Sequence, residues 1–132
     1  MGYCVDLKDC KFTIKKENIT PAYNTLVEYA KQKLKLNERL CWIYLEDIAH
    51  SVTLTEALEY CDFDLIYDDD GNVYDIDWIG ENLGDHEEIL NVIAPYVNDG
   101  SYMHMCGEDG EHWKWVFEDD KCYYKTSKIV WE

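Results

Sequence analysis

Apolar and polar residues alternate with a period of two at the start of the chain. The alternation places Tyr3, Val5 and Leu7 at every second position, with Cys4 and Asp6 between them. Such alternation predicts a half-buried β-strand. Phe12 and Ile14 continue the spacing, and we expect them to extend this strand after a bend.

Residues 63–79 predict a β-hairpin with one apolar face. The alternation continues on both sides of a turn at residues 68–72, where Gly71 supplies the positive φ that a tight reversal often needs. In the second strand, the apolar face is expected to comprise Tyr74, Ile76 and Trp78.

Three further strands are predicted between Ser101 and Trp131. The turn residues Asp109-Gly110 separate the first pair and Asp119-Asp120 separate the second. In the middle strand, Trp113, Trp115 and Phe117 share one face by alternation.

A spacing of three and four residues predicts helices elsewhere. Thr20 and Pro21 fit the N-cap and first position of a helix that ends near Leu36. Thr53 and Glu56 form a capping box, in which Glu56 is expected to reach the Thr53 amide. Residues 40–50 are ambiguous between a buried strand and a short helix.

Asp85 and Glu88 predict a further helix start, with Asp85 as N-cap, and Pro95 helps to end that helix. Antiparallel strands with segregated helices indicate the α+β class. We expect residues 1–132 to form a single domain, with an antiparallel sheet of about five or six strands and two or three helices packed on one face.

The net charge of −16 is unevenly distributed. Residues 40–113 contain 19 Asp or Glu and no Lys or Arg. Direct binding to nucleic acid needs cations, so this acidity argues against it. It suits a basic protein surface as partner, or it serves only solubility.

The densest acidic stretch, residues 62–88, is the candidate partner-binding surface. Carboxylates at positions i and i+2 of a strand repeat at about 6.6–6.8 Å, and rows of them can occupy a cationic groove that otherwise holds nucleic acid. The alternative is a merely solvated face. The candidate residues are Asp62, Asp64, Asp68, Asp69, Asp70, Asp75, Asp77, Glu81, Asp85, Glu87 and Glu88.

The acidic turn does not match the ligand positions of a calcium-binding EF-hand loop. With Gly71 at position 6 of an EF-hand, Ile66 occupies the first ligand position and Asp77 the last. His104 and Cys106 share a strand face, but one such pair is too few for a zinc site. A looser cation site on the turn carboxylates is the alternative, but we expect no metal and no cofactor.

No sequence signature of a nucleophile, a phosphate loop or a catalytic triad occurs, so we assign no catalytic residue and expect no enzyme activity. His86 and His112 are expected to be surface histidines that lie near acids by chance. Two alternatives remain. One is a small carboxylate- or metal-dependent enzyme, and the other is a small-molecule-binding module with a pocket lined by Trp78, Trp113 or Trp115. The favoured interpretation of these three rings is that they belong to the core.

Six cysteines lie at scattered positions without a CxxC pair, and the N-terminus is charged within its first six residues. We expect no secretion signal, a cytoplasmic location and reduced thiols. No apolar run approaches the length of a membrane helix.

The stretches MGYCVDLKDCKFTI, IAPYVNDGSY and GEDGEHWKWVF, with the closing VW, resemble a group of small acidic proteins from phages, prophages and accessory regions of bacterial genomes. Residues 36–60 share nothing with that group. The resemblance implies action in the cytoplasm of a bacterial host. By analogy it implies an inhibitor, acting as a nucleic-acid mimic, of a host system such as a CRISPR effector or a restriction enzyme.

Overall fold

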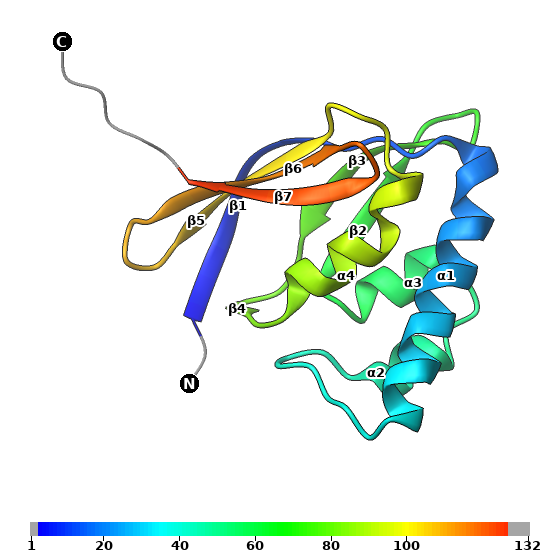
Figure 1. The fold of residues 1–132 in the computed structure, drawn as a ribbon. Coiled ribbons are helices and arrows are strands. Elements are labelled where there is room, and N and C mark those ends of the chain that lie inside the picture. Colours follow the sequence, from blue (N-terminus) through cyan, green and yellow to red (C-terminus); the bar gives the residue numbers. More distant parts are fainter. Residues whose placement is uncertain (1–2, 127–132) are drawn as a thin grey trace, which may run out of the picture.

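The structure is a computed structural model that describes residues 3–126. It confirms the α+β class: a curled antiparallel sheet lies on one side and the helices pack against its inner face (Figure 1). The strand order of the five-stranded sheet is β4-β1-β5-β6-β7. Its strands are β1 (Tyr3–Lys11), β4 (Asn82–Leu83), β5 (Tyr102–Gly107), β6 (His112–Glu118) and β7 (Lys121–Thr126).

The first strand is longer than the alternation indicates. Its register against β5 shifts between Leu7 and Asp9, so Lys8 is an extra residue and the pairing continues to Lys11. Phe12 follows the strand, and Ile14 makes an isolated bridge with Val73. The three C-terminal strands are confirmed as far as Thr126, and the rest of the last one, residues 127–131, lies outside the described residues.

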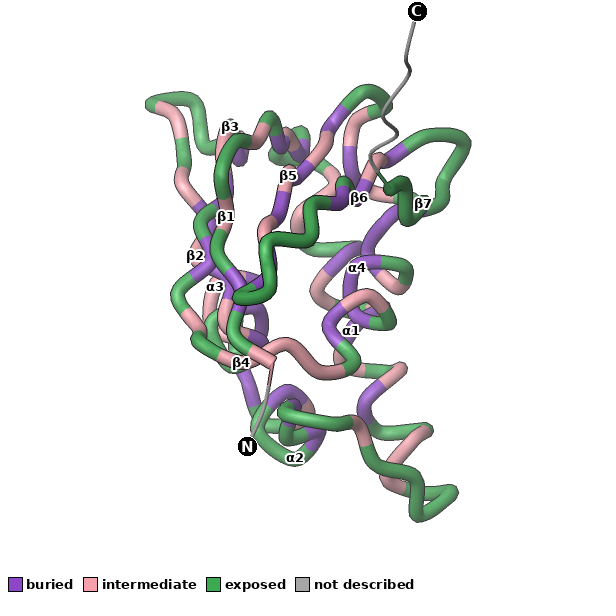
Figure 2. Tube along the Cα trace, turned by 90° about the vertical axis from the view of Figure 1, so that its left-hand side faces the viewer, coloured by how far each residue is buried: buried purple, intermediate pink, exposed green. Residues whose placement is uncertain are grey.

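The predicted hairpin forms a separate two-stranded sheet of β2 (Phe63–Tyr67) and β3 (Val73–Trp78). It lies beside β1, whereas the helix α4 (His86–Ile93) lies near β7 (Figure 2). The expectation that Tyr74 belongs to the apolar face is wrong. Tyr67 pairs with Val73 and Ile66 with Asp75, so Tyr74 bulges and its side chain is exposed.

The first helix, α1 (Lys16–Lys35), begins four residues before the predicted N-cap. Pro21 is inside the helix and not at its first position. The additional turn is stabilised by a residue distant in the sequence, because the Lys16 amide donates to Asn72 Oδ1 at 2.8 Å. The remaining helices are α2 (Leu45–Ala49), α3 (Leu54–Glu59), α4 and the 3₁₀ turn Ala94–Tyr96.

The segment that was ambiguous by pattern is helical in its second half, as α2. The capping box is partly correct. Thr53 Oγ1 accepts from the Glu56 amide, but Glu56 Oε1 accepts from the Val52 amide instead of that of Thr53. None of the helices within residues 3–126 is both long and apolar enough to cross a bilayer.

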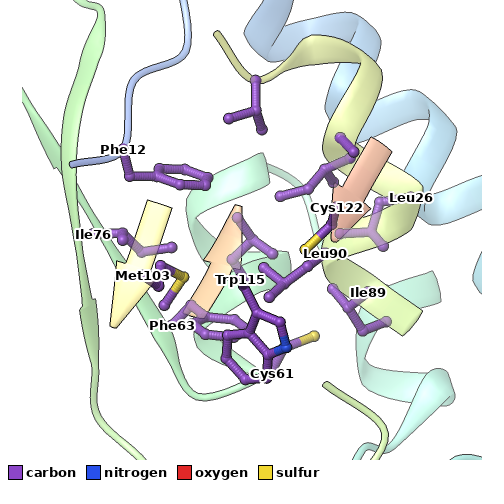
Figure 3. Packing of buried hydrophobic residues seen from close by; sticks show 14 of the residues in the cluster. Phe12, Leu26, Cys61, Phe63, Ile76, Ile89, Leu90, Met103, Trp115 and Cys122 are labelled. Carbon is purple, nitrogen blue, oxygen red and sulfur yellow. The ribbon is translucent and has the colours of Figure 1, made fainter. Parts of the chain in front are cut away.

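The core lies between the inner face of the curled sheet, the hairpin, α1 and α4 (Figure 3). Trp115 projects from the sheet toward this core, where Phe63 comes from the hairpin and Leu90 from α4. Trp113, Trp115 and Phe117 are buried on one face of β6, as predicted.

Candidate functional site

The hairpin places several carboxylates on its solvent side. Asp64 on β2 is directly opposite Asp77 on β3, and Asp75 is opposite Ile66. Asp77 is exposed, whereas Asp64 and Asp75 are half-buried. The three side chains form one acidic face, which we call the hairpin face together with Asp69 and Asp70 at the exposed turn.

Asp68 has a structural role in that turn. Its Oδ1 accepts from the amides of Asp70 and Asn72, both at 2.9 Å, as in an Asx-turn. The hydrogen bond from the Asn72 amide is the main reason that the pKa of the Asp68 carboxyl lies below its usual value. Asn72 in turn accepts from the first turn of α1, so Asp68 links the hairpin to that helix.

Asp75 also makes internal contacts. Its Oδ1 accepts from the Cys10 thiol at 2.9 Å and from the Ile76 amide. Burial and the Asp75 carboxylate raise the pKa of Cys10 to about 12. Asp75 therefore joins the hairpin to β1, and a substitution that reverses its charge would disturb that contact.

Asp62 lies away from the hairpin face, next to a buried histidine. Its Oδ2 is 3.1 Å from His86 Nε2, and the Gly84 amide donates to His86 Nδ1. Because Nδ1 accepts, Nε2 carries the proton and donates to Asp62. The expectation of a surface His86 is wrong: its ring is fully buried, with its centroid 4.9 Å from that of Trp78.

Asp85 occupies the N-cap position of α4, as predicted, but its side chain does not cap the helix, because it makes no hydrogen bond to α4. Its Oδ2 accepts instead from the Cys41 amide at 2.7 Å, while the Asp85 amide donates to the Cys41 carbonyl. This exchange of two hydrogen bonds fastens the loop before α2 to the start of α4.

Among the described residues, no lysine or arginine forms an ion pair with a candidate carboxylate. Within residues 3–126, Lys33 pairs with Glu38 and Arg39 with Glu46, and neither forms an ion pair with the stretch from 62 to 88. Three lysines lie near that stretch without pairing with it: Lys8 lines a hollow with Asp75 and Asp77, the Lys16 side chain is close to Gly71, and Lys33 is attracted by Glu88. The ion pair that involves this stretch is Asp62 with His86. Burial lowers the pKa of His86, so at neutral pH that partner is uncharged.

The remaining candidate acids lie near α4. Glu81 is exposed between β3 and β4, and its carbonyl accepts from the Val5 amide. Glu87 Oε1 accepts from Trp115 Nε1 at 2.8 Å, and Glu88 Oε2 accepts from the Tyr29 hydroxyl at 2.7 Å. The fold therefore divides the sequence-predicted surface into the hairpin face and a second acidic area at α4.

That second area borders a groove of about 610 Å³ between α4 and the inner side of β6 and β7. A hollow of about 330 Å³ adjoins it and shares Leu83, Trp113 and Tyr124 with it. We call the two together the α4 groove. Trp113 and Trp115 border the groove but are buried members of the core, and so is Trp78, which lies under the hairpin and donates to the Val5 carbonyl.

Tyr124 and Glu111 are groove residues that sequence reasoning did not select. Tyr124 is opposite Trp115 in the β6–β7 register, and its hydroxyl donates to Glu111 Oε1 at 3.3 Å. The alternation of Trp113 and Trp115 was the available signal, since a residue paired with either shares its face.

His104, Cys106 and His112 form a row on the outer side of the sheet. His104 Nε2 is 3.0 Å from His112 Nδ1, and His112 Nε2 is 3.7 Å from Cys106 Sγ. Across the part of the chain that the structure describes, no group of three such side chains has a geometry that could hold a metal ion.

Comparison of the chain with protein families, with curated proteins and with solved structures found no match.

Proposed function

We propose that the protein is a non-enzymatic acidic binding protein whose hairpin face occupies a cationic, nucleic-acid-binding surface of another protein. The observation that carries this proposal is that, within residues 3–126, no lysine or arginine forms an ion pair with any carboxylate from 62 to 88, although Lys8 and Lys16 lie at the edges of the hairpin. A solvated face usually intersperses both signs of charge. A surface with one sign attracts an oppositely charged partner over a long range.

The arrangement of the hairpin carboxylates supports the mimicry. Asp75 and Asp77 are two positions apart on one strand, which corresponds to about 6.6–6.8 Å along the strand. Asp64 lies across from Asp77 on the neighbouring strand. The face therefore presents charges in two directions, as phosphates do along a nucleic-acid backbone.

The biological setting is inferred from the sequence resemblance alone. A phage or accessory-genome protein acting in the bacterial cytoplasm would meet host defence proteins that grip DNA or RNA with basic grooves. An inhibitor of such a protein needs affinity for those grooves and no catalytic group of its own. This is an analogy of context, and it selects the partners to be tested first.

The test is a charge reversal restricted to carboxylates without a structural hydrogen bond to another element. Asp68 and Asp75 are excluded because they hold the turn and the contact with Cys10. The variant carries Asp64→Lys, Asp69→Lys, Asp70→Lys and Asp77→Lys. A matched control reverses four exposed acids elsewhere: Glu28→Lys, Asp47→Lys, Asp99→Lys and Glu118→Lys.

Both variants and the native protein are immobilised and exposed to a bacterial lysate, and the bound proteins are eluted with duplex DNA and identified. We expect nucleic-acid-binding proteins to elute from the native protein and from the control, but not from the hairpin variant. Retention should also fall steeply with salt. Equal retention by all three proteins, or no release by DNA, would contradict the proposal.

A further inference from the structure

The α4 groove has a lining that differs in kind from the hairpin face, because it combines aromatic rings with carboxylates. The centroids of Trp113 and Trp115 are 5.9 Å apart with planes at 74°, so the two rings meet edge to face. Tyr124 stacks on Trp113 at 6.3 Å. Aromatic faces carry negative potential and attract cations.

The carboxylates of the groove are held in place by neutral donors. Glu87 accepts from the Trp115 indole, Glu88 from the Tyr29 hydroxyl and Glu111 from the Tyr124 hydroxyl. These hydrogen bonds orient the side chains without cancelling their charge. The groove is therefore a preorganised anionic site, which lowers the entropic cost of binding a cation.

Among residues 3–126, no lysine or arginine lines either part of the groove. Its volume lies within the range of sites that bind small molecules or a few residues of a peptide. We propose that the α4 groove binds an arginine side chain of a partner polypeptide. Glu88 would contact the guanidinium, which would lie against the Tyr124 ring, the exposed aromatic ring of the groove.

Arginine fits better than lysine because its planar guanidinium stacks on aromatic rings and forms paired hydrogen bonds with a carboxylate. This inference rests on the proposed function, since it supposes a basic protein as partner. It adds a specific anchor to the long-range attraction of the hairpin face.

The probe is the peptide acetyl-Gly-Arg-Gly-amide, and its citrulline counterpart has nearly the same shape without the charge. Calorimetric titration of the native protein should show saturable binding of the arginine peptide. The citrulline peptide should bind at least about tenfold more weakly. Equal binding of the two peptides, or no saturable binding of either, overturns the inference. Binding of free spermidine or choline without binding of the peptide overturns the assignment to arginine.

Two variants locate the site. Glu88→Gln keeps the acceptor for Tyr29 and removes the charge, and Tyr124→Leu removes an aromatic wall that is exposed at the edge of the groove. Each should weaken the arginine peptide by about tenfold, while Asp69→Asn on the hairpin turn leaves it unchanged. Unchanged affinity in both groove variants overturns the inference.

The same variants separate this inference from the proposed function. If Glu88→Gln and Tyr124→Leu retain the lysate partners and the hairpin variant loses them, the groove inference fails and the hairpin proposal holds. If the arginine peptide binds in the groove and the hairpin variant retains every partner, the groove inference holds and the hairpin proposal fails.

Discussion

Asp64 and Asp77 lie directly opposite each other in the hairpin, so two like charges face one another across neighbouring strands. Such a pair destabilises a sheet. We expect Asp64→Asn to raise the free energy of unfolding by roughly 0.2–1 kcal/mol. Because salt screens exposed charges, the gain should shrink at high salt. Urea denaturation at low and high salt measures both effects.

The matched control is Asp6→Asn, an exposed strand position that is opposite the uncharged Cys106. It should change the stability less than Asp64→Asn does. A protein that retains a repulsive pair at a cost in stability fits a face selected for binding. A loss of stability in Asp64→Asn would show instead that the pair is not repulsive.

The six cysteines are unpaired in the structure and differ widely in exposure. Cys4 and Cys41 are exposed, whereas Cys61 and Cys122 are buried. Burial raises the pKa of Cys122 to about 12 and also raises that of Cys61, so few thiolates form there.

We therefore expect a thiol reagent at neutral pH to modify Cys4 and Cys41 rapidly in the native protein. All six should react after denaturation under non-reducing conditions. Mass spectrometry of digested samples identifies the labelled positions. Rapid labelling of Cys61 or Cys122 in the native state would contradict the packing of the core, and two or fewer free thiols after denaturation would contradict the reduced state.

The alternation of apolar and polar residues predicted the strands well, because it reflects which face of a strand is buried. The inner face of β6 is an example. Local patterns failed where a distant residue completes an element. The start of α1 depends on Asn72, and Asp85 serves the Cys41 amide instead of its own helix. Sequence spacing contains no information about such partners.

Partners that are distant in the sequence also limited the prediction of the candidate functional site. The acidity of residues 62–88 was apparent from the sequence, but its division between the hairpin face and α4 depends on tertiary packing. Trp113 and Trp115 were recognised as a candidate pocket lining. Their combination with Glu87 and Glu88 was not recognised, because α4 reaches β6 only in the folded chain.

Gly84 lies where the loop before α2 contacts the start of α4. A Cβ at this position would be 2.0 Å from the Cys41 carbonyl oxygen, which is backbone and must move as a whole. We expect Gly84→Ala to destabilise the protein by about 3 kcal/mol. The Cys41 amide, which donates to Asp85, should also lose protection from hydrogen exchange.

Gly100→Ala is the control for this change. Gly100 has a φ of +89° and no atom within 4 Å of an added Cβ, so only backbone strain applies. Its cost should be about 1 kcal/mol, without an effect on the Cys41 amide. If Gly84→Ala costs no more than Gly100→Ala, the close approach of Gly84 to Cys41 is not maintained in solution.

His86 makes the stability depend on pH in a defined direction. Burial lowers its pKa in the folded protein, and hydrogen bonding to Asp62 offsets this only in part. The unfolded chain therefore binds a proton at a higher pH than the folded protein does. The contribution of His86 is complete above the ordinary histidine pKa of about 6.5 and is lost as the pH falls from there through the folded pKa.

Below about pH 6.5, the free energy of unfolding should fall as the pH falls, and the part due to His86 can have a slope of at most about 1.4 kcal/mol per pH unit, the limit for one proton. Asp68, whose pKa is lowered by the Asn72 amide, contributes only at more acidic pH.

The variant His86→Asn tests this expectation, because Asn keeps a side-chain acceptor near the Gly84 amide but cannot titrate. Whatever the stability of the variant at neutral pH, its free energy of unfolding should depend less on pH in this range. His50→Gln, at an exposed position, should keep the native slope. Urea denaturation across this pH range provides the measurement, and an unchanged slope in His86→Asn would show that the buried imidazole does not control it.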